Sequence, residues 1–153
     1  TGAPGIPRNN PMAMLPFCGY NMGDYFTHWL SFQQRLKPPP KIFHVNWFRQ
    51  DNDHRNLWPG FGENVRVLDW ILRRVDGEVG SMPCPLGKIP EPKDLNLSGL
   101  ELGDEQVNRL FAIGRPAWRE EAQRNLLFLN RFGNRLPLLL GAEHRALVDR
   151  LSS

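Results

Sequence analysis

One stretch of the sequence concentrates residue types that could recognise a planar ligand: Val45 to Asn64, VNWFRQDNDHRNLWPGFGEN. Its two turns carry four large aromatic residues, Trp47, Phe48, Trp58 and Phe61. Aromatic faces stack on nucleobases, and each stacked base contributes roughly 1–3 kcal/mol in nucleic-acid binders. Gly60 and Gly62 would let the backbone approach a ligand closely, and Asn64 carries both a carbonyl acceptor and an amide donor. The stretch therefore predicts a site that stacks on a base and hydrogen-bonds to its edge.

The same residue types also fit a second interpretation, in which the aromatic side chains pack beneath a loop. The sequence contains no GxxxxGK[ST] phosphate loop, no HExxH, no paired CxxC and no GxSxG. Its four histidines are scattered among separate predicted elements, and Cys18 and Cys84 are most simply small buried hydrophobes. The residues alone thus predict no catalytic centre and no metal site, and they leave base binding and simple packing both open.

The elements that position this stretch follow from hydrophobic spacing and from the places of Pro and Gly. The lead-in Thr1 to Pro11 is rich in Gly and Pro and predicts no regular structure. Helices are predicted at Asp24–Lys37, from Glu63 or Asn64 to Gly77, at Asp104–Phe111, Pro116–Gly133 and Ala142–Leu151, with Asp24 and Asp104 as the N-caps of the first and third. Lys41 to Phe48 predicts a buried strand, and Pro83 to Pro92 predicts loop or short extended segments. The predicted fold class is α/β, with few strands and a helix-rich C-terminal third.

Two of the predicted helices carry an apolar stripe that should face a core. In the second helix the stripe is Val67, Leu68, Ile71, Leu72 and Val75. In the fourth it is Trp118, Ala122, Leu126 and Leu129. The strand Lys41–Phe48 has no evident pairing partner within the chain, and an unpaired apolar edge favours aggregation. The isolated chain is therefore expected to be poorly soluble, or to occur together with further residues.

The composition is that of an ordinary folded chain: of 153 residues, 41% are apolar and 23% are charged. Lys and Arg number 19 against 16 Asp and Glu, and the two signs are interleaved, so neither a nucleic-acid arm nor a membrane patch is predicted. No apolar run reaches 18 residues, and the start lacks a signal-peptide core. These features predict a soluble, cytoplasmic protein, and a chain that begins with Thr1 suggests a fragment.

Four segments resemble the C-terminal part of the GTP-dependent phosphoenolpyruvate carboxykinases. They are PMAMLPFCGYNMGDYFTHWL (Pro11–Leu30), KIFHVNWFR (Lys41–Arg49), LWPGFGEN (Leu57–Asn64) and PLGKIP (Pro85–Pro90), in the family's order and spacing. The resemblance implies a cytoplasmic, monomeric lyase of gluconeogenesis, which converts oxaloacetate and GTP to phosphoenolpyruvate, CO2 and GDP with Mn2+ or Mg2+. It also implies that residues 11–153 are the C-terminal part of the nucleotide-binding domain, incomplete without upstream residues. Residues 1–10 would be a loop, with Thr1 to Ile6 as the tail of a lid.

The resemblance also implies which residues bind the nucleotide. Phe48 and Phe61 would form an aromatic slot for guanine, and the other implied contacts are Trp47, Gly62, Glu63 and Asn64. Guanine presents O6 as an acceptor and N1–H and N2–H as donors. An asparagine with nearby backbone groups can match this pattern and leave adenine unmatched, which would favour GTP over ATP.

The chain departs from the family in two places and lacks several of its parts. Asn56 stands where the family usually has a third phenylalanine, which predicts a weaker slot, and Val65 stands where serine is common. The family's phosphate-binding loop with its reactive cysteine, its metal ligands and its oxaloacetate-binding arginines all lie upstream of the matched region. Neither Cys18 nor Cys84 takes that role, so this chain by itself is expected to be inactive. The alternatives are a non-catalytic guanine-nucleotide-binding or interaction module, and an inactive fragment.

Overall fold

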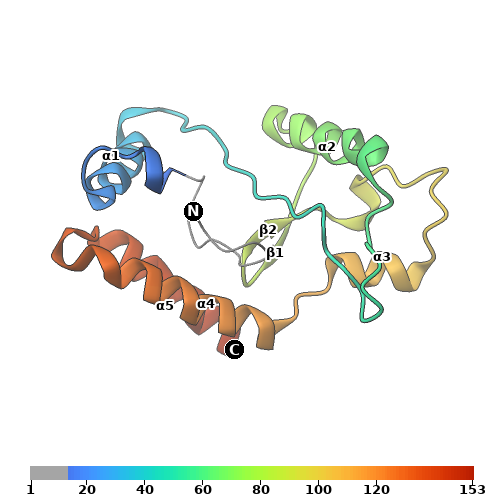
Figure 1. Cartoon of the computed structure of the whole chain (residues 1–153). Coiled ribbons are helices and arrows are strands. Elements are labelled where there is room, and N and C mark those ends of the chain that lie inside the picture. Colours follow the sequence, from blue (N-terminus) through green and yellow to red (C-terminus); the bar gives the residue numbers. More distant parts are fainter. Residues whose placement is uncertain (1–13) are drawn as a thin grey trace. The chain divides into compact units, whose positions relative to one another are not determined.

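The computed structural model describes residues 14–153, which divide into two compact units (Figure 1). The terminal unit combines the chain up to Pro40 with Gly114–Ser153, and the central unit is Lys41–Ile113. The predicted lead-in Thr1–Pro11, with the lid tail inside it, lies outside the described residues. Among the described helices, none is both long enough and apolar enough to cross a membrane.

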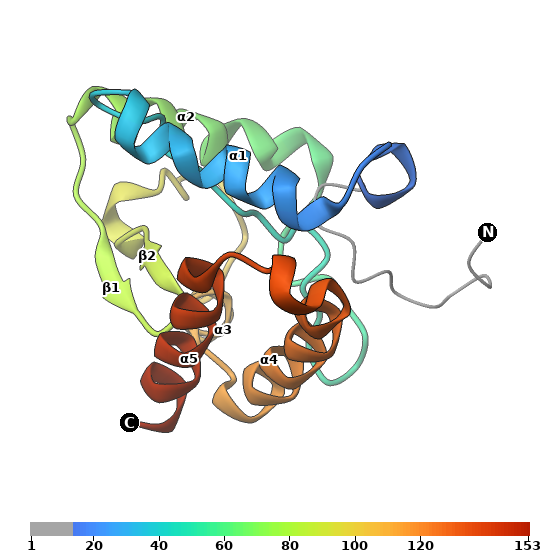
Figure 2. The same cartoon turned by 90° about the vertical axis from the view of Figure 1, so that its left-hand side faces the viewer.

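The terminal unit is made of helices. They are α1 (Met22–Arg35), α4 (Arg115–Leu129) and α5 (Leu138–Ser152), with short 3₁₀ helices at Leu15–Phe17 and Asn130–Arg135. Helices α4 and α5 lie side by side (Figure 2). The core is a cluster of four buried side chains, Met22, Phe26, Phe128 and Phe132. The ring of Phe132 meets Phe26 and Phe128 edge to face, at centroid distances of 5.5 and 5.2 Å, a geometry that aromatic pairs prefer.

Helix α1 begins two residues before its predicted start at Asp24. The cap is Asn21, whose side-chain oxygen accepts a hydrogen bond from the backbone N–H of Gly23 at 2.8 Å. Asp24 lies in the first turn instead, where a carboxylate suits the positive end of the helix, and it pairs with Arg135 at 2.8 Å. The helix ends at Arg35 rather than Lys37, so the prediction of this helix was right in position and wrong at both ends.

Helix α4 keeps Pro116 in its first turn, as predicted, but its α-helical turns end at Leu129 rather than Gly133. A 3₁₀ segment follows, and Gly133 interrupts it with a φ of 52°, in the left-handed region. The predicted buried face was partly wrong. Leu126 is 42% exposed, and Phe128 is buried in its place.

Helix α5 begins at Leu138, earlier than the predicted Ala142. Pro137 occupies the N-cap position, where its missing N–H costs nothing and its fixed φ suits a helix start. The helix is anchored near its end by Leu151, which is 1% exposed. The side chain of Arg115 donates to the carbonyl of Arg150 at 3.3 Å, a cation at the negative end of the helix.

The central unit holds α2 (Asn64–Asp76), α3 (Asp104–Phe111) and 3₁₀ helices at Phe61–Glu63 and Pro92–Asp94. It also holds the antiparallel hairpin of β1 (Met82–Cys84) and β2 (Gly87–Ile89), in which Met82 pairs with Ile89 and Cys84 with Gly87. The hairpin confirms the short extended segments predicted from Pro83 to Pro92. The start and end of α2 are confirmed as well, with Gly77 at φ 83° as its C-cap. The range of α3 is confirmed, but the prediction that Asp104 caps it was wrong: Asp104 is the first helical residue, and the N-cap is Gly103, which makes no side-chain hydrogen bond.

The core of the central unit is formed by Trp58, Trp70 and Leu95. The predicted stripe of α2 divides into two faces. Val67 and Ile71 pack against this core together with the buried Trp70. Three others are exposed, Leu68 (49%), Leu72 (65%) and Val75 (49%). The apolar face of α2 is thus wider than the core it covers, and its prediction as a single buried stripe was wrong.

The predicted buried strand Lys41–Phe48 is absent. Residues 41–46 form no strand and lead to a turn at Trp47 and Phe48, and the sheet of the described residues contains only β1 and β2. Alternate side chains still differ in burial: Phe43 is half-buried and meets Trp70 edge to face, whereas Ile42 is 78% exposed. Within residues 14–153 the fold is helix-rich with one two-stranded sheet, a weaker strand content than the predicted α/β class.

Candidate functional site

Two aromatic rings of the predicted slot lie on the surface of the central unit. Phe48 is 76% exposed and Phe61 is 91% exposed. Neither takes part in a ring–ring contact with another described residue. Trp47, by contrast, is half-buried and packs against the core. The rings of Phe48 and Phe61 are therefore accessible, whereas Trp47 contributes to the packing of the core.

The backbone around Phe48 is fixed by hydrogen bonds. Its N–H donates to the side-chain oxygen of Asn46 at 3.0 Å, which closes the turn. The guanidinium of Arg49 donates to the carbonyls of Leu110 and Ala112 at 2.9 and 2.6 Å, at the C-terminal end of α3. A cation there pairs with carbonyls that the helix leaves unpaired, and it interacts favourably with the negative end of the helix dipole. Helix α3 therefore holds the turn that presents Phe48.

Between the two rings the chain forms a closed turn around Asp51. Its carboxylate accepts hydrogen bonds from the backbone N–H groups of Asp53 and Arg55, both at 2.9 Å. These bonds, that from Arg55 first, hold the pKa of Asp51 below its ordinary value of 3.8, because they stabilise the ionised carboxylate. An isolated bridge joins Gln50 to Asn56, and their side chains meet at 3.4 Å. Asn56 therefore lies at the base of this turn.

Phe61 sits at the entrance to α2. Gly60, just before it, has a φ of 133°, a conformation that other residues rarely adopt, so a glycine is required here. The N–H of Glu63 donates to the carbonyl of Gly60 at 3.1 Å and closes the 3₁₀ turn Phe61–Glu63. Nothing lies within 4 Å of the position that a Cβ on Gly62 would occupy. The turn thus presents Phe61 beside open space.

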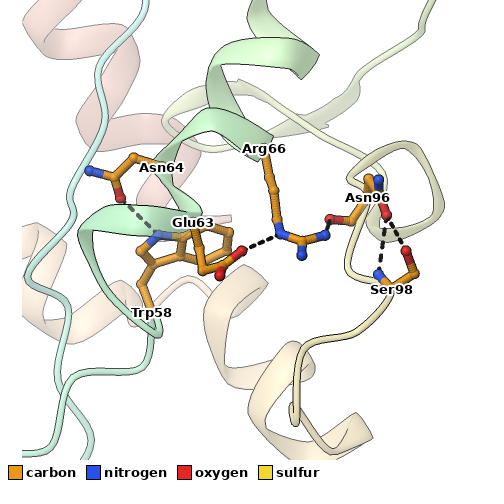
Figure 3. Close-up of polar contacts among 6 residues, drawn as sticks. All are labelled: Trp58, Glu63, Asn64, Arg66, Asn96 and Ser98. Carbon is orange, nitrogen blue, oxygen red and sulfur yellow. Dashed lines mark hydrogen bonds and ion pairs between the residues drawn. The ribbon is translucent and has the colours of Figure 1, made fainter.

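Asn64 and Glu63 are both held by side-chain bonds (Figure 3). The indole N–H of Trp58 donates to the amide oxygen of Asn64 at 2.9 Å. Glu63 pairs with Arg66, which also donates to the carbonyl of Asn96 at 2.8 Å. The Trp58–Asn64 bond fixes the first turn of α2 to the core, and the Arg66–Asn96 bond fixes it to the segment around Asn96.

A shallow surface depression in the central unit is lined by Glu63, Val65, Arg66, Asp69 and Asn96. It contains one predicted site residue, Glu63, and neither of the two exposed rings. In the part of the chain that the structure describes, no three His, Cys, Asp or Glu side chains gather as a metal site would require. The predicted residues Phe61, Gly62, Glu63 and Asn64 are brought together on one turn, and Phe48 comes from a separate turn. Their role in nucleotide binding stays a prediction.

The supporting residues of the site were not singled out from the sequence. Arg49 and Arg66 had no predicted role, and Trp58 was predicted only as one of four aromatic residues that could stack on a base or pack beneath a loop; it is 6% exposed and lies in the core. For Trp58 a signal exists: an indole carries only a donor, and a buried one needs an acceptor, which Asn64 six residues later supplies. The partners of Arg49 lie about sixty residues away in the sequence, so local patterns could not find them.

Comparison with known proteins gives one family. Residues 1–150 match the model of the phosphoenolpyruvate carboxykinase C-terminal P-loop domain. The chain is 47% identical to the phosphoenolpyruvate carboxykinase [GTP] of Neocallimastix frontalis, over 99% of this chain and 25% of that protein. It is 46% identical to the protein of the same name from Thermoplasma volcanium, over 87% of this chain and 22% of the relative. The chain is also 46% identical to the protein of the same name from Chlamydia felis, over 93% of this chain and 24% of the relative. The chain spans about a quarter of the length of these relatives.

Proposed function

The chain belongs to the GTP-dependent phosphoenolpyruvate carboxykinase family, and we propose that it provides the guanine-binding part of that enzyme. The whole enzyme would convert oxaloacetate and GTP to phosphoenolpyruvate, CO2 and GDP. Phe48 and Phe61 would stack on the base, and Glu63, Asn64 and the backbone at Gly62 would contact its edge. Trp47 would support the slot from beneath.

The observation that carries this proposal is the exposure of Phe48 and Phe61 on a constrained backbone. A base that covers these rings removes apolar surface from water, which contributes about 25 cal/mol for each Å² buried. Their neighbours fit a base: glycines allow close approach, and an amide supplies polar groups for the edge. A nucleobase buries a flat apolar face and leaves polar edges to pair, which matches this arrangement.

The remaining chemistry is assigned to other residues of the enzyme. This sequence has no GxxxxGK[ST] loop, and residues 14–153 gather no cluster of metal-ligating side chains. We therefore assign the phosphate groups, the Mn2+ or Mg2+ ion and the oxaloacetate to residues outside this chain. When bound, the metal would neutralise charge on the transferring phosphoryl group. The residues of this chain bind and orient the base, which places the phosphates for reaction elsewhere.

The proposal is tested by native mass measurement of the protein that carries this sequence, followed by calorimetric titration with GDP and then ADP. A mass well above 17.6 kDa together with tighter binding of GDP than ADP would support an enzyme of which this chain is part. A mass near 17.6 kDa with GDP still preferred would favour a non-catalytic guanine-nucleotide-binding module. Failure to bind either nucleotide would refute the guanine site.

A further inference from the structure

The bond between Trp58 and Asn64 joins a buried group to a half-buried one. Trp58 is 6% exposed and belongs to the core of the central unit, whereas Asn64 is the first residue of α2. The indole nitrogen lies 2.9 Å from the amide oxygen of Asn64. The bond therefore connects the packing of the core to the residue that the proposed function places against the base edge.

The chemistry of the indole fixes which way the Asn64 amide faces. An indole N–H can donate and cannot accept, so it must face the amide oxygen and not the amide NH2 group. The reversed amide would place donor against donor and leave the buried indole N–H unpaired, which disfavours it by roughly tenfold or more. Figure 3 shows the result: the oxygen of Asn64 points at the indole of Trp58 and the nitrogen points away from it.

The outward amide nitrogen of Asn64 is free to meet a ligand as far as residues 14–153 are concerned. Within the described chain, the NH2 group of Asn64 donates to no acceptor. An NH2 group can satisfy an acceptor on a ligand and cannot satisfy a donor. At the 6-position of a purine, guanine and hypoxanthine carry an oxo acceptor, whereas adenine carries an amino donor. A fixed NH2 group thus distinguishes these bases by polarity.

We infer that Trp58 is a positioning residue for base selection: by holding the Asn64 oxygen, it presents the Asn64 NH2 group as a donor to a 6-oxopurine. The inference rests on the proposed guanine site. It separates two contributions to binding. Stacking on Phe48 and Phe61 is tolerant of base identity, whereas the oriented amide supplies the preference.

The test compares Trp58→Phe with Trp70→Phe in the full polypeptide that carries this sequence. Both indoles are buried in the same cluster, at 6% and 4% exposure, and both variants lose similar ring volume. Trp70 is a matched control because its indole N–H has no hydrogen-bond partner among residues 14–153, so its removal breaks no such bond. A loss of packing alone would affect both variants alike.

The measurement is the affinity for GDP, inosine diphosphate and ADP by calorimetry. Inosine diphosphate keeps the 6-oxo group and lacks the 2-amino group. In Trp58→Phe the affinity for GDP and inosine diphosphate should fall about tenfold with ADP unchanged, the scale of one oriented hydrogen bond. In Trp70→Phe the ratio of GDP to ADP affinity should stay as in the wild type. An unchanged ratio in Trp58→Phe, or an equal change in both variants, would overturn the inference.

A second variant keeps the test decisive if Trp58→Phe does not fold. Asn64→Asp retains an oxygen for the indole of Trp58 and replaces the outward NH2 group by an acceptor. Its preference should shift from GDP toward the diphosphate of 2,6-diaminopurine riboside, which has a donor at the 6-position. An unshifted preference would overturn the inference and leave the guanine site standing. A wild type that does not prefer GDP over ADP would instead refute the guanine site itself.

Discussion

Truncation of Phe61 to alanine separates stacking from stability. The ring is 91% exposed, so its removal uncovers almost no core and should change the free energy of unfolding by less than about 0.5 kcal/mol. The same substitution should change the free energy of GDP binding by much more than it changes the free energy of unfolding. One base stacked on an aromatic ring contributes about 1–3 kcal/mol to binding, so losing the ring should raise the dissociation constant for GDP roughly 5- to 150-fold.

The base dependence of this loss is a second part of the prediction. Every purine has an aromatic face, so stacking is tolerant of base identity. Phe61→Ala should therefore weaken GDP and ADP by similar factors and leave the ratio of their affinities unchanged. Trp58→Phe should do the opposite and change the ratio. The two variants thus report on different contributions to binding.

The assay is calorimetric titration of GDP and ADP into the full polypeptide, with urea denaturation run on the same samples. Phe17→Ala is the matched control, because that ring is 79% exposed and belongs to the terminal unit, whereas the proposed site is built from residues of the central unit. Phe48→Ala and the double variant complete a double-mutant cycle. If both rings stack on one base, their effects should couple by about 0.5 kcal/mol or more. GDP affinity that is the same in Phe61→Ala and in the wild type would refute the stacking argument.

Three further predictions test the fold and the slot. A Cβ on residue 23 would overlap the backbone carbonyl of Arg135, so Gly23→Ala should lower the free energy of unfolding by about 1–3 kcal/mol in urea denaturation. The control Gly141→Ala, inside α5, should not lower it. The lowered pKa of Asp51 means that its turn is ordered above that carboxyl's ordinary value of 3.8 and loosens as the pH falls through the lower folded value. The amide resonance of Arg55 should accordingly titrate with a midpoint below 3.8, and a midpoint at or above it would contradict the hydrogen bond. Asn56 is exposed with one long side-chain contact, so Asn56→Phe should fold normally and tighten GDP binding by roughly fivefold, and an unchanged affinity would remove the idea of a missing third ring.

The parts of the fold that the sequence predicted well depend on local signals. Helix α2 ends where Gly77 adopts a left-handed conformation, and α3 spans the range expected from Asp104 at its start, although Asp104 is not its cap. The turn from Phe61 to Asn64 follows from Gly60, whose φ of 133° suits a glycine. In each case the residues that decide the structure lie within a few positions of it.

The failures share a different cause, since each depended on a contact distant in sequence or on a competing local group. The residue types of Lys41–Phe48 predicted a buried strand, but Phe43 packs on the core while Ile42 is exposed, and a strand also needs a neighbour to hydrogen-bond with. At α1, Asn21 outcompeted Asp24 as the cap because its oxygen reaches the N–H of Gly23. Periodicity identifies a face and does not identify its partner.

The proposed site joins both kinds of determinant. Composition and glycine placement indicated four aromatic candidates, Trp47, Phe48, Trp58 and Phe61, and only the resemblance to the family singled out Phe48 and Phe61 as the slot. The orientation of Asn64 could not be predicted, because it depends on the burial of Trp58, and burial is a property of the whole central unit. Once the indole is buried, its single donor must find an acceptor, and the amide has no freedom left. Affinity would then arise from the visible surface residues, and selectivity from a core residue that need not touch the ligand.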